Sequence, residues 1–134
     1  ILGGRAYGFT MNTSSSGRFA TAVNCIDGRL QQPVSDFVRN RFAVDFVDMV
    51  TDAGVVASIH QGVLDSVKIS VESHNSVGIA VVAHENCDGN PIPEKAQRTQ
   101  CLEAAQLLAL YWPELEVVPL WVPADRSVEI IPRK

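Results

Sequence analysis

Short apolar runs alternate with longer amphipathic segments along most of the chain. The strongest run, residues 77–83, is continuously apolar, as expected of a parallel strand that is covered on both faces. Similar runs, bounded by polar or turn-forming residues, predict the other strands. These are residues 18–25, 43–50 and 115–122, with a short antiparallel edge strand over 127–131.

Three segments carry apolar residues at helical spacing. The first is residues 33–42, where Pro33 suits the first turn of a helix. In residues 63–74 the spacing is helical, although β-branched residues also suit a strand, and we favour a helix. The third helix spans residues 94–112 and is closed by Pro113.

The alternation of strands and helices predicts a three-layer α/β domain. Its central sheet should hold four mostly parallel strands and the antiparallel edge strand. Residues 1–18 are rich in Gly, Ser, Thr and Asn, which predicts a flexible N-terminal arm. Residues 19–134 should then form one α/β domain, large enough to bury a core without disulfides.

Composition narrows the classes of partner. The net charge is −4 at pH 7, so we expect no nucleic-acid partner, which would need a basic stripe. No apolar run approaches the roughly 18–20 residues that a membrane span needs, and the N-terminal residues do not read as a signal peptide. Three cysteines, an odd number, fit a reducing compartment better than a disulfide framework, so we expect a cytoplasmic protein.

The candidate chemistry follows two of the predicted strands. Cys25, Asp27 and Arg29 come at alternate positions after the first strand, and His84 and Cys87 follow the strongest one. In open α/β sheets, sites form beyond the carboxyl ends of the strands, where the strand order reverses. If the two strands are neighbours at that point, the two polar stretches meet.

Cys25, His84 and Cys87 form a Cys2His set that is typical of zinc. Zinc binds thiolate and imidazole ligands in a tetrahedron, and catalytic sites keep one position for water or substrate. The spacing of His84 and Cys87 is short enough for chelation, whereas Cys25 must be brought in by the fold. Each group also has an ordinary alternative: a buried cysteine packs as a small apolar residue, and Asp27 and Arg29 could form a surface ion pair.

These residues resemble the motifs of the β-class carbonic anhydrases. That family carries Cys-x-Asp-x-Arg after its first strand and His-x-x-Cys after a later one, on an α/β fold. The resemblance covers roughly residues 19–122. It implies that Cys25, His84 and Cys87 bind Zn²⁺, with water in the fourth position.

The resemblance also implies an activity. Zinc would lower the pKa of its water, and the zinc-bound hydroxide would attack carbon dioxide, giving reversible hydration to bicarbonate. Asp27 would orient that water, while Arg29 would pair with Asp27 and hold it off the metal. In some members of the family the aspartate is instead the fourth ligand, and the spacing here permits either state. Members are dimers or higher assemblies, so a homodimer is expected.

Three positions depart from the pattern of the family. Gly28 stands where Ser is usual, Asp88 follows the second cysteine in place of Gly, and Ser16 stands where a substrate-holding Gln is common. Two alternatives to the carbonic anhydrase reaction therefore stay open. One is a related enzyme acting on carbonyl sulfide or carbon disulfide, and the other is a non-catalytic zinc-binding interaction protein.

Several further residues have structural interpretations. Cys101 lies on the apolar stripe of the last helix, which predicts core packing. His74 should end a helix and interact with its C-terminal dipole. His60 has no partner that the sequence identifies, which predicts a surface or loop position. The aromatic residues that could line a pocket or interface, or pack in the core, are Phe37, Phe42 and Phe46.

Overall fold

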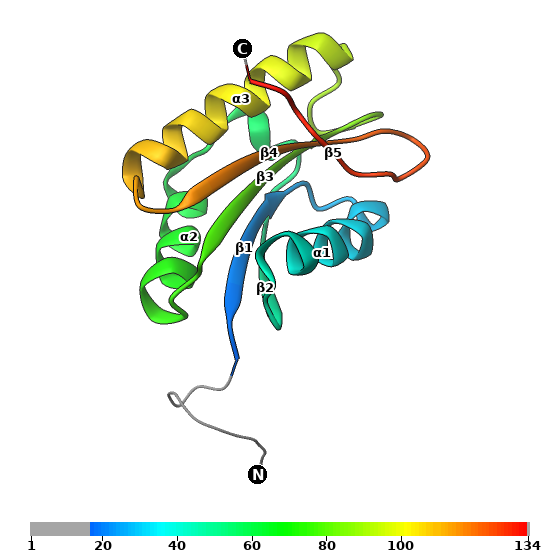
Figure 1. Ribbon diagram of the computed structural model, residues 1–134. Coiled ribbons are helices and arrows are strands. Elements are labelled where there is room, and N and C mark those ends of the chain that lie inside the picture. Colours follow the sequence, from blue (N-terminus) through cyan, green and yellow to red (C-terminus); the bar gives the residue numbers. More distant parts are fainter. Residues whose placement is uncertain (1–16, 134) are drawn as a thin grey trace.

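A computed structural model describes residues 17–133 and contains one five-stranded sheet (Figure 1). Its strands are β1 (Phe19–Asn24), β2 (Phe46–Thr51), β3 (Gly78–His84), β4 (Glu116–Val122) and β5 (Glu129–Ile130). The strand order is β2-β1-β3-β4-β5. The first four strands are parallel to their neighbours, and β5 is antiparallel to β4. The predicted sheet and its antiparallel edge strand are therefore confirmed.

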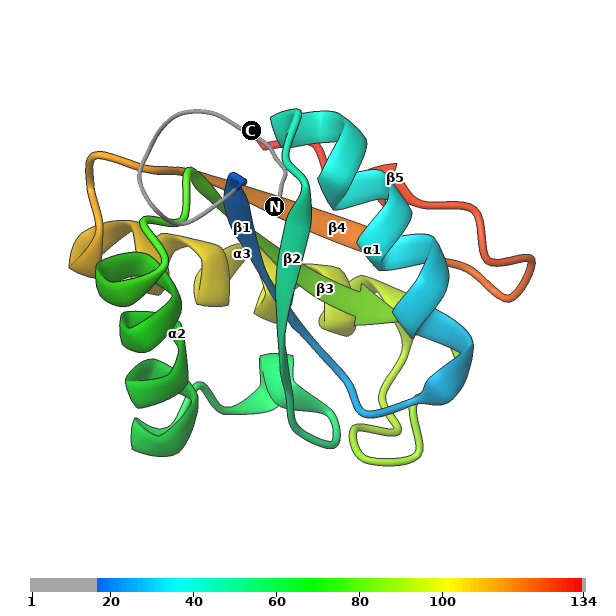
Figure 2. The ribbon, with the colours of Figure 1, turned by 90° about the horizontal axis from the view of Figure 1, so that it is seen from below.

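Helices cover both faces of this sheet. They are α1 (Gly28–Phe42), the short 3-10 helix η1 (Val55–Ala57), α2 (Gln61–Ser73) and α3 (Glu94–Tyr111). Helix α1 packs on one face, while α2 and α3 pack on the other (Figure 2). The three layers are those predicted from the alternating pattern.

Strand β3 separates the two cores, and all seven of its residues are buried. Because alternate side chains of a strand point to opposite faces, Ile79 and Val81 join the core under α2 and α3, while Ala80 and Val82 join the core under α1. Cys101 lies fully buried in the first core, where its Sγ donates to the Val81 carbonyl at 3.2 Å. Burial raises the pKa of the Cys101 thiol to about 12. Its predicted core role is confirmed.

Helix α1 begins at Gly28, so the prediction that Pro33 opens the helix was wrong. The cap is Asp27, whose carboxylate accepts the backbone N–H of Arg29 at 2.9 Å. Pro33 lies inside the helix, where its missing N–H leaves the Arg29 carbonyl without its usual helical donor. The early start matters because it places the residues after β1 directly at a helix N-terminus.

Other boundaries differ by a few residues. Strand β2 begins at Phe46, later than expected, because Ala43 ends α1 in the left-handed conformation with φ 53°. The N–H of Val44 then bonds back to the Arg39 carbonyl at 3.1 Å. The helix predicted over 63–74 is confirmed as α2, whereas η1 had no sequence signal that we identified.

His74 caps the C-terminus of α2, as predicted, and its N–H donates to the Ser70 carbonyl at 3.2 Å. Its Nδ1 lies 2.7 Å from a carboxylate oxygen of Asp48, and its ring stacks 4.4 Å from that of Phe19. The histidine therefore joins α2 to β1 and β2.

The three phenylalanines divide between two environments. Phe37 and Phe42 pack against the core under α1, which is one of the roles that the sequence left open for them. Phe46, at the start of edge strand β2, is 49% exposed, with its ring 5.1 Å from that of Phe19. Phe46 is therefore not a core residue of this chain.

Most of the predicted arm, residues 1–18, lies outside the described residues, and so does Ser16. Of the arm, Arg18 is held by Asp45, whose carboxylate accepts its N–H at 2.8 Å. Between residues 17 and 133, the helices are all too short or too polar to cross a membrane.

Candidate metal centre

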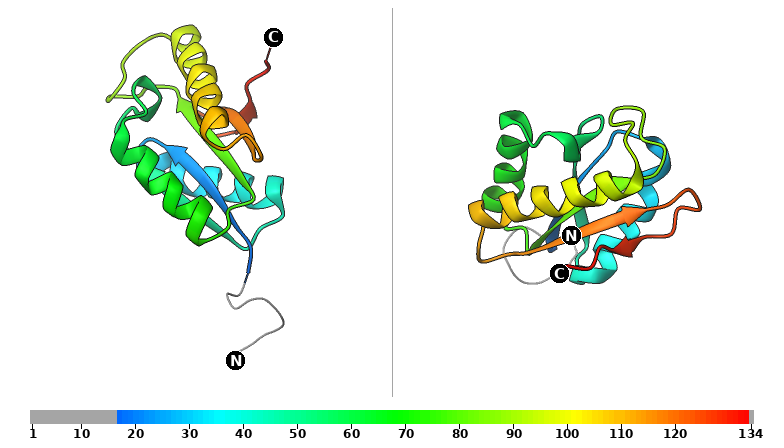
Figure 3. Two further views of the ribbon diagram at one scale, coloured as in Figure 1. Left: turned by 90° about the vertical axis from the view of Figure 1, so that its left-hand side faces the viewer. Right: turned by 90° about the horizontal axis from the view of Figure 1, so that it is seen from above.

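The site forms where β1 and β3 end side by side. The two strands are parallel neighbours, with Val23 opposite Val81, so the residues that follow them leave the sheet at one edge. The chain runs from β1 to β2 on one side, and β3 lies on the other, so the strand order reverses here. The loops after β1, β2 and β3 gather at this edge (Figure 3).

Cys25, His84 and Cys87 each bring one potential ligand atom into a cluster in which all three atoms lie within 4.8 Å of one another. The three residues are buried, with exposed fractions of 5%, 3% and 4%. The two Sγ atoms are 3.9 Å apart. Two zinc–sulfur bonds of about 2.3 Å in a tetrahedron imply a separation of roughly 3.8 Å, so the donor set and its spacing fit zinc.

His84 is prepared to act as a ligand through Nε2. Its Nδ1 donates to the Glu85 carbonyl at 2.9 Å, so in this tautomer Nε2 carries a lone pair. Nε2 is buried and has no hydrogen-bond partner among residues 17–133, which is costly unless something else binds it. Burial also lowers the pKa of His84, which favours the neutral form that a metal requires.

Backbone N–H groups approach both sulfur atoms. Cys25 Sγ accepts the N–H of Gly54 at 3.4 Å, and the N–H groups of Gly89 and Asn90 lie near Cys87, where each favours the thiolate. Burial and the neighbouring Cys25 nevertheless raise the pKa of the Cys87 thiol. Without a cation the Cys87 thiol therefore resists ionisation, and a bound cation would reverse that preference.

Asp27 and Arg29, in the segment that follows Cys25, form a bidentate pair. Nε of Arg29 donates to Oδ1 at 3.0 Å, and Nη2 donates to Oδ2 at 2.6 Å. The Asp27 side chain is mostly buried, at 18% exposed, while that of Arg29 is 59% exposed. The Arg29 hydrogen bonds hold the pKa of Asp27 well below its usual range, so the carboxylate stays ionised.

The sequence did not identify the supporting roles of three residues, which are Gln31, Gly54 and Gly89. Gln31 bonds to two carbonyls of the loop after β1, and Gly54 packs directly on Gly89. Gly54 lies in the loop after β2, and its contact with the loop after β3 depends on the tertiary fold. Nothing in the local sequence marks Gln31, because a glutamine near a helix start is common on protein surfaces.

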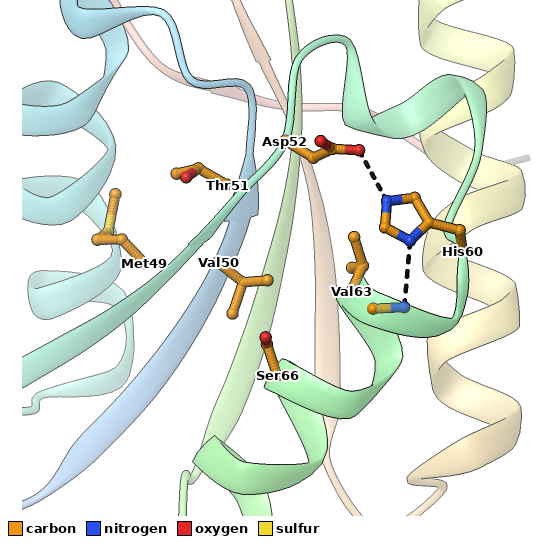
Figure 4. Close-up of a pocket in the computed structure, with 8 residues that line it drawn as sticks. Met49, Val50, Thr51, Asp52, His60, Val63 and Ser66 are labelled. Atoms are coloured by element: carbon orange, nitrogen blue, oxygen red, sulfur yellow. Dashed lines mark hydrogen bonds and ion pairs between the residues drawn. The ribbon is translucent and has the colours of Figure 1, made fainter.

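The remaining histidine and cysteine candidates lie away from the centre. His60 caps α2 by accepting the N–H of Gly62 at 3.1 Å, and its Nε2 lies 2.9 Å from Asp52 Oδ2 (Figure 4). The surface or loop position predicted for His60 is confirmed, since the residue is exposed and directly precedes α2. Its partner Asp52 comes from the turn after β2, which folds back onto the start of α2. The pair borders an open cleft of about 310 Å³ beside β2.

Comparisons with known proteins agree with this architecture. The model of the family described as "putative carbonic anhydrase" matches residues 15–132. A carbonic anhydrase from Streptococcus mutans is similar in structure, with a TM-score of 0.62 at 17% identity, over 84% of this chain and 81% of that one.

Two further solved structures share the fold. A carbonic anhydrase from Glaciozyma antarctica has a TM-score of 0.59 at 15% identity, over 84% of this chain and 81% of that one. The beta-carbonic anhydrase isoform I from Trichomonas vaginalis has a TM-score of 0.53 at 13% identity, over 92% of this chain and 87% of that one. At these identities the likeness concerns the fold alone. No curated protein matches the chain.

Proposed function

The chain belongs to the family described as putative carbonic anhydrases, and from this premise we propose that it is a zinc-dependent lyase that hydrates carbon dioxide reversibly to bicarbonate. One observation carries the proposal. The buried Cys25, His84 and Cys87 cluster, with its unpaired Nε2, lies beside an ionised carboxylate that is held by an arginine. A purely structural zinc site would not need that second group.

The three clustered residues would hold the metal. When bound, zinc supplies a Lewis acid that lowers the pKa of water toward neutrality, which gives the nucleophile that hydration of carbon dioxide needs. The Glu85 carbonyl fixes the tautomer and the ring orientation of His84, as outer partners of metal-binding histidines generally do. Burial of Cys25 and Cys87 keeps bulk water away from the two thiolates.

Asp27 would orient the attacking water by accepting its hydrogen bond. Both carboxylate oxygens already receive bonds from Arg29, and the carboxylate remains ionised. A carboxylate oxygen has more than one lone pair, so this pairing leaves acceptor capacity for water. Arg29 would thus keep Asp27 turned toward the guanidinium and available as an acceptor, in preference to binding metal.

We also propose a homodimer in a reducing compartment such as the cytoplasm. The half-exposed Phe46 on edge strand β2 supports a partner on that side of the sheet, since an unpaired edge is usually covered or protected. Three free thiols support the compartment.

The test is stopped-flow carbon dioxide hydration by the full chain loaded with zinc, with one zinc per chain verified by elemental analysis. We expect catalysis that rises with pH as the nucleophile forms. Asp27→Asn should keep its zinc and lose about 100-fold or more in kcat/KM, because the acceptor charge is gone. Asp88→Asn, an exposed acid beside Cys87, is the matched control and should retain most of the activity.

Absence of hydration by the zinc-loaded chain across the pH range would overturn the lyase proposal. In that case hydrolysis of carbonyl sulfide or carbon disulfide, assayed with the same preparation, would identify the related enzyme. A zinc-loaded chain that turns over none of these substrates would instead be an interaction protein. Failure to bind zinc at all would remove the metal centre itself.

A further inference from the structure

Gln31 makes three hydrogen bonds around the loop that carries Cys25 and Asp27. Its Nε2 donates to the Cys25 carbonyl at 2.9 Å and to the Asp27 carbonyl at 2.7 Å. Its Oε1 accepts the Nδ2 of Asn24 at 3.1 Å. One amide group therefore joins the side chain of the last residue of β1 to the backbone carbonyls of Cys25 and Asp27.

Asn24 sets which way the Gln31 amide points. The side chain of Asn24 is fully buried, and its Nδ2 donates both to Gln31 Oε1 and to the Cys25 carbonyl at 3.1 Å. Because Nδ2 needs an acceptor, it holds Oε1 of Gln31 toward the strand. The two donor hydrogens of Nε2 then face the loop carbonyls.

The two Nε2 bonds of Gln31 hold the loop backbone at Cys25 and at Asp27, the two residues whose side chains belong to the candidate site. The Cys25 carbonyl begins the peptide group that leads to Ile26, and the Asp27 carbonyl begins α1. Holding both carbonyls on one amide fixes the turn between strand and helix, and so the directions in which the thiol and the carboxylate leave the backbone. Ile26, at 62% exposed, contributes little packing that could do this instead.

We propose that Gln31 is a positioning residue for the metal centre, which fixes the loop so that Cys25 and Asp27 share one side. The inference rests on the proposed function, since it assigns Gln31 a role in a zinc site. It concerns preorganisation: a loop that is already held in the binding geometry loses less conformational entropy when the metal binds. Outer partners of metal ligands are typically worth 10- to 100-fold in affinity.

Gln31→Met tests the role, and Gln32→Met is its matched control. Both replace a glutamine by a residue of similar length and helix propensity, at adjacent positions of α1. Gln32 is exposed, and its side chain makes no hydrogen bond within residues 17–133. Zinc affinity of each full-length variant would be measured by competition with a chromogenic chelator.

We expect the zinc dissociation constant to rise about tenfold or more in Gln31→Met and to stay within about twofold of wild type in Gln32→Met. The cobalt-substituted Gln31→Met protein should also show shifted visible bands, because the cysteine and carboxylate are less well held. Gln31→Glu keeps the length and acceptor but loses both donors. It should weaken zinc binding as well, and it tests the positioning role of Gln31 if Gln31→Met does not fold.

Hydrogen exchange of the metal-free chain gives a readout that needs no zinc. Gln31→Met should speed exchange at the amides of residues 26–29 and leave the sheet unchanged. Equal zinc affinity in Gln31→Met and Gln32→Met would overturn the inference, as would faster exchange throughout the sheet, which indicates a general loss of stability. If wild type binds no zinc, the proposed function fails, and the exchange pattern alone shows whether Gln31 holds the loop.

Discussion

The backbone of Gly54 lies directly against the backbone of Gly89. A Cβ atom on Gly54 would be 2.5 Å from the Gly89 carbonyl oxygen, and one on Gly89 would be 2.8 Å from Gly54 N. Gly54 also has φ +60°, which L side chains rarely adopt. This contact joins the loop after β2 to the loop that carries Cys87, and it leaves the Gly54 N–H 3.4 Å from Cys25 Sγ.

Gly54→Ala should therefore weaken both the fold and the metal centre. The left-handed conformation and the overlap with Gly89 together cost about 1–3 kcal/mol of unfolding free energy. Displacing the Gly54 N–H from Cys25 should raise the zinc dissociation constant about tenfold. Urea unfolding of the metal-free chain and chelator competition measure the two effects.

Gly28→Ala is the control for this substitution. A Cβ atom at Gly28 meets nothing within 4 Å, and the residue lies in the first turn of α1, where alanine is favourable. We expect unchanged zinc affinity and equal or slightly higher stability. If Gly54→Ala and Gly28→Ala behave alike, close backbone contact with Gly89 has no role in the site.

The sequence predicts the layers and the meeting of the two motifs because these depend on strong local signals. The apolar run that becomes β3 is short and continuous, as a buried strand should be, and helices between the strands favour parallel pairing. The start of α1 was predicted wrongly because Asp27 was assigned only to the candidate site. Asp27 is also the cap of the helix, so α1 begins at Gly28 and not near Pro33.

The contacts that support the site could not be predicted from the sequence. Gly54 meets Gly89 only because the loops after β2 and β3 converge at one edge of the sheet. Gln31 faces the loop carbonyls only because α1 starts early enough to place it there. Both contacts depend on distances between segments far apart in sequence or on a boundary that was predicted wrongly.

Substitutions of Cys87 and Cys101, which are buried in different environments, should affect zinc binding differently. Cys87→Ala removes a member of the ligand cluster and should reduce affinity by more than the roughly 10- to 100-fold typical of losing an outer partner. Cys101→Ala removes the same group from the core under α3, outside the ligand cluster, and the chain should still bind one zinc. Elemental analysis after dialysis checks both, and loss of zinc in Cys101→Ala would contradict the assignment.

Arg29→Gln should release the carboxylate of Asp27. In wild type the folded-state pKa lies below the ordinary value of 3.8, so the pair stabilises the fold above that pH and the contribution is lost as the pH falls. In the variant, the pKa of Asp27 should rise toward its ordinary value. Carboxyl carbon chemical shifts of the metal-free chain measure this, with Arg39→Gln, a change at a half-exposed arginine of α1, as the control. An unchanged Asp27 pKa would show that Arg29 is not its main partner.

Cys101 predicts how the stability of the chain depends on pH in alkaline solution. Its pKa rises from an ordinary value of 9.0 to about 12 in the fold, so the folded state keeps a proton that the unfolded state loses. The thiol therefore has no effect on stability below pH 9, and it lowers stability progressively between pH 9 and 12. At pH 10 the loss is about 1 kcal/mol relative to neutral pH. Urea unfolding of wild type and Cys101→Ala at pH 7 and 10 tests this. The variant starts from lower stability because of its cavity, yet it should lose less on going to pH 10, and an equal loss in both proteins would refute the prediction.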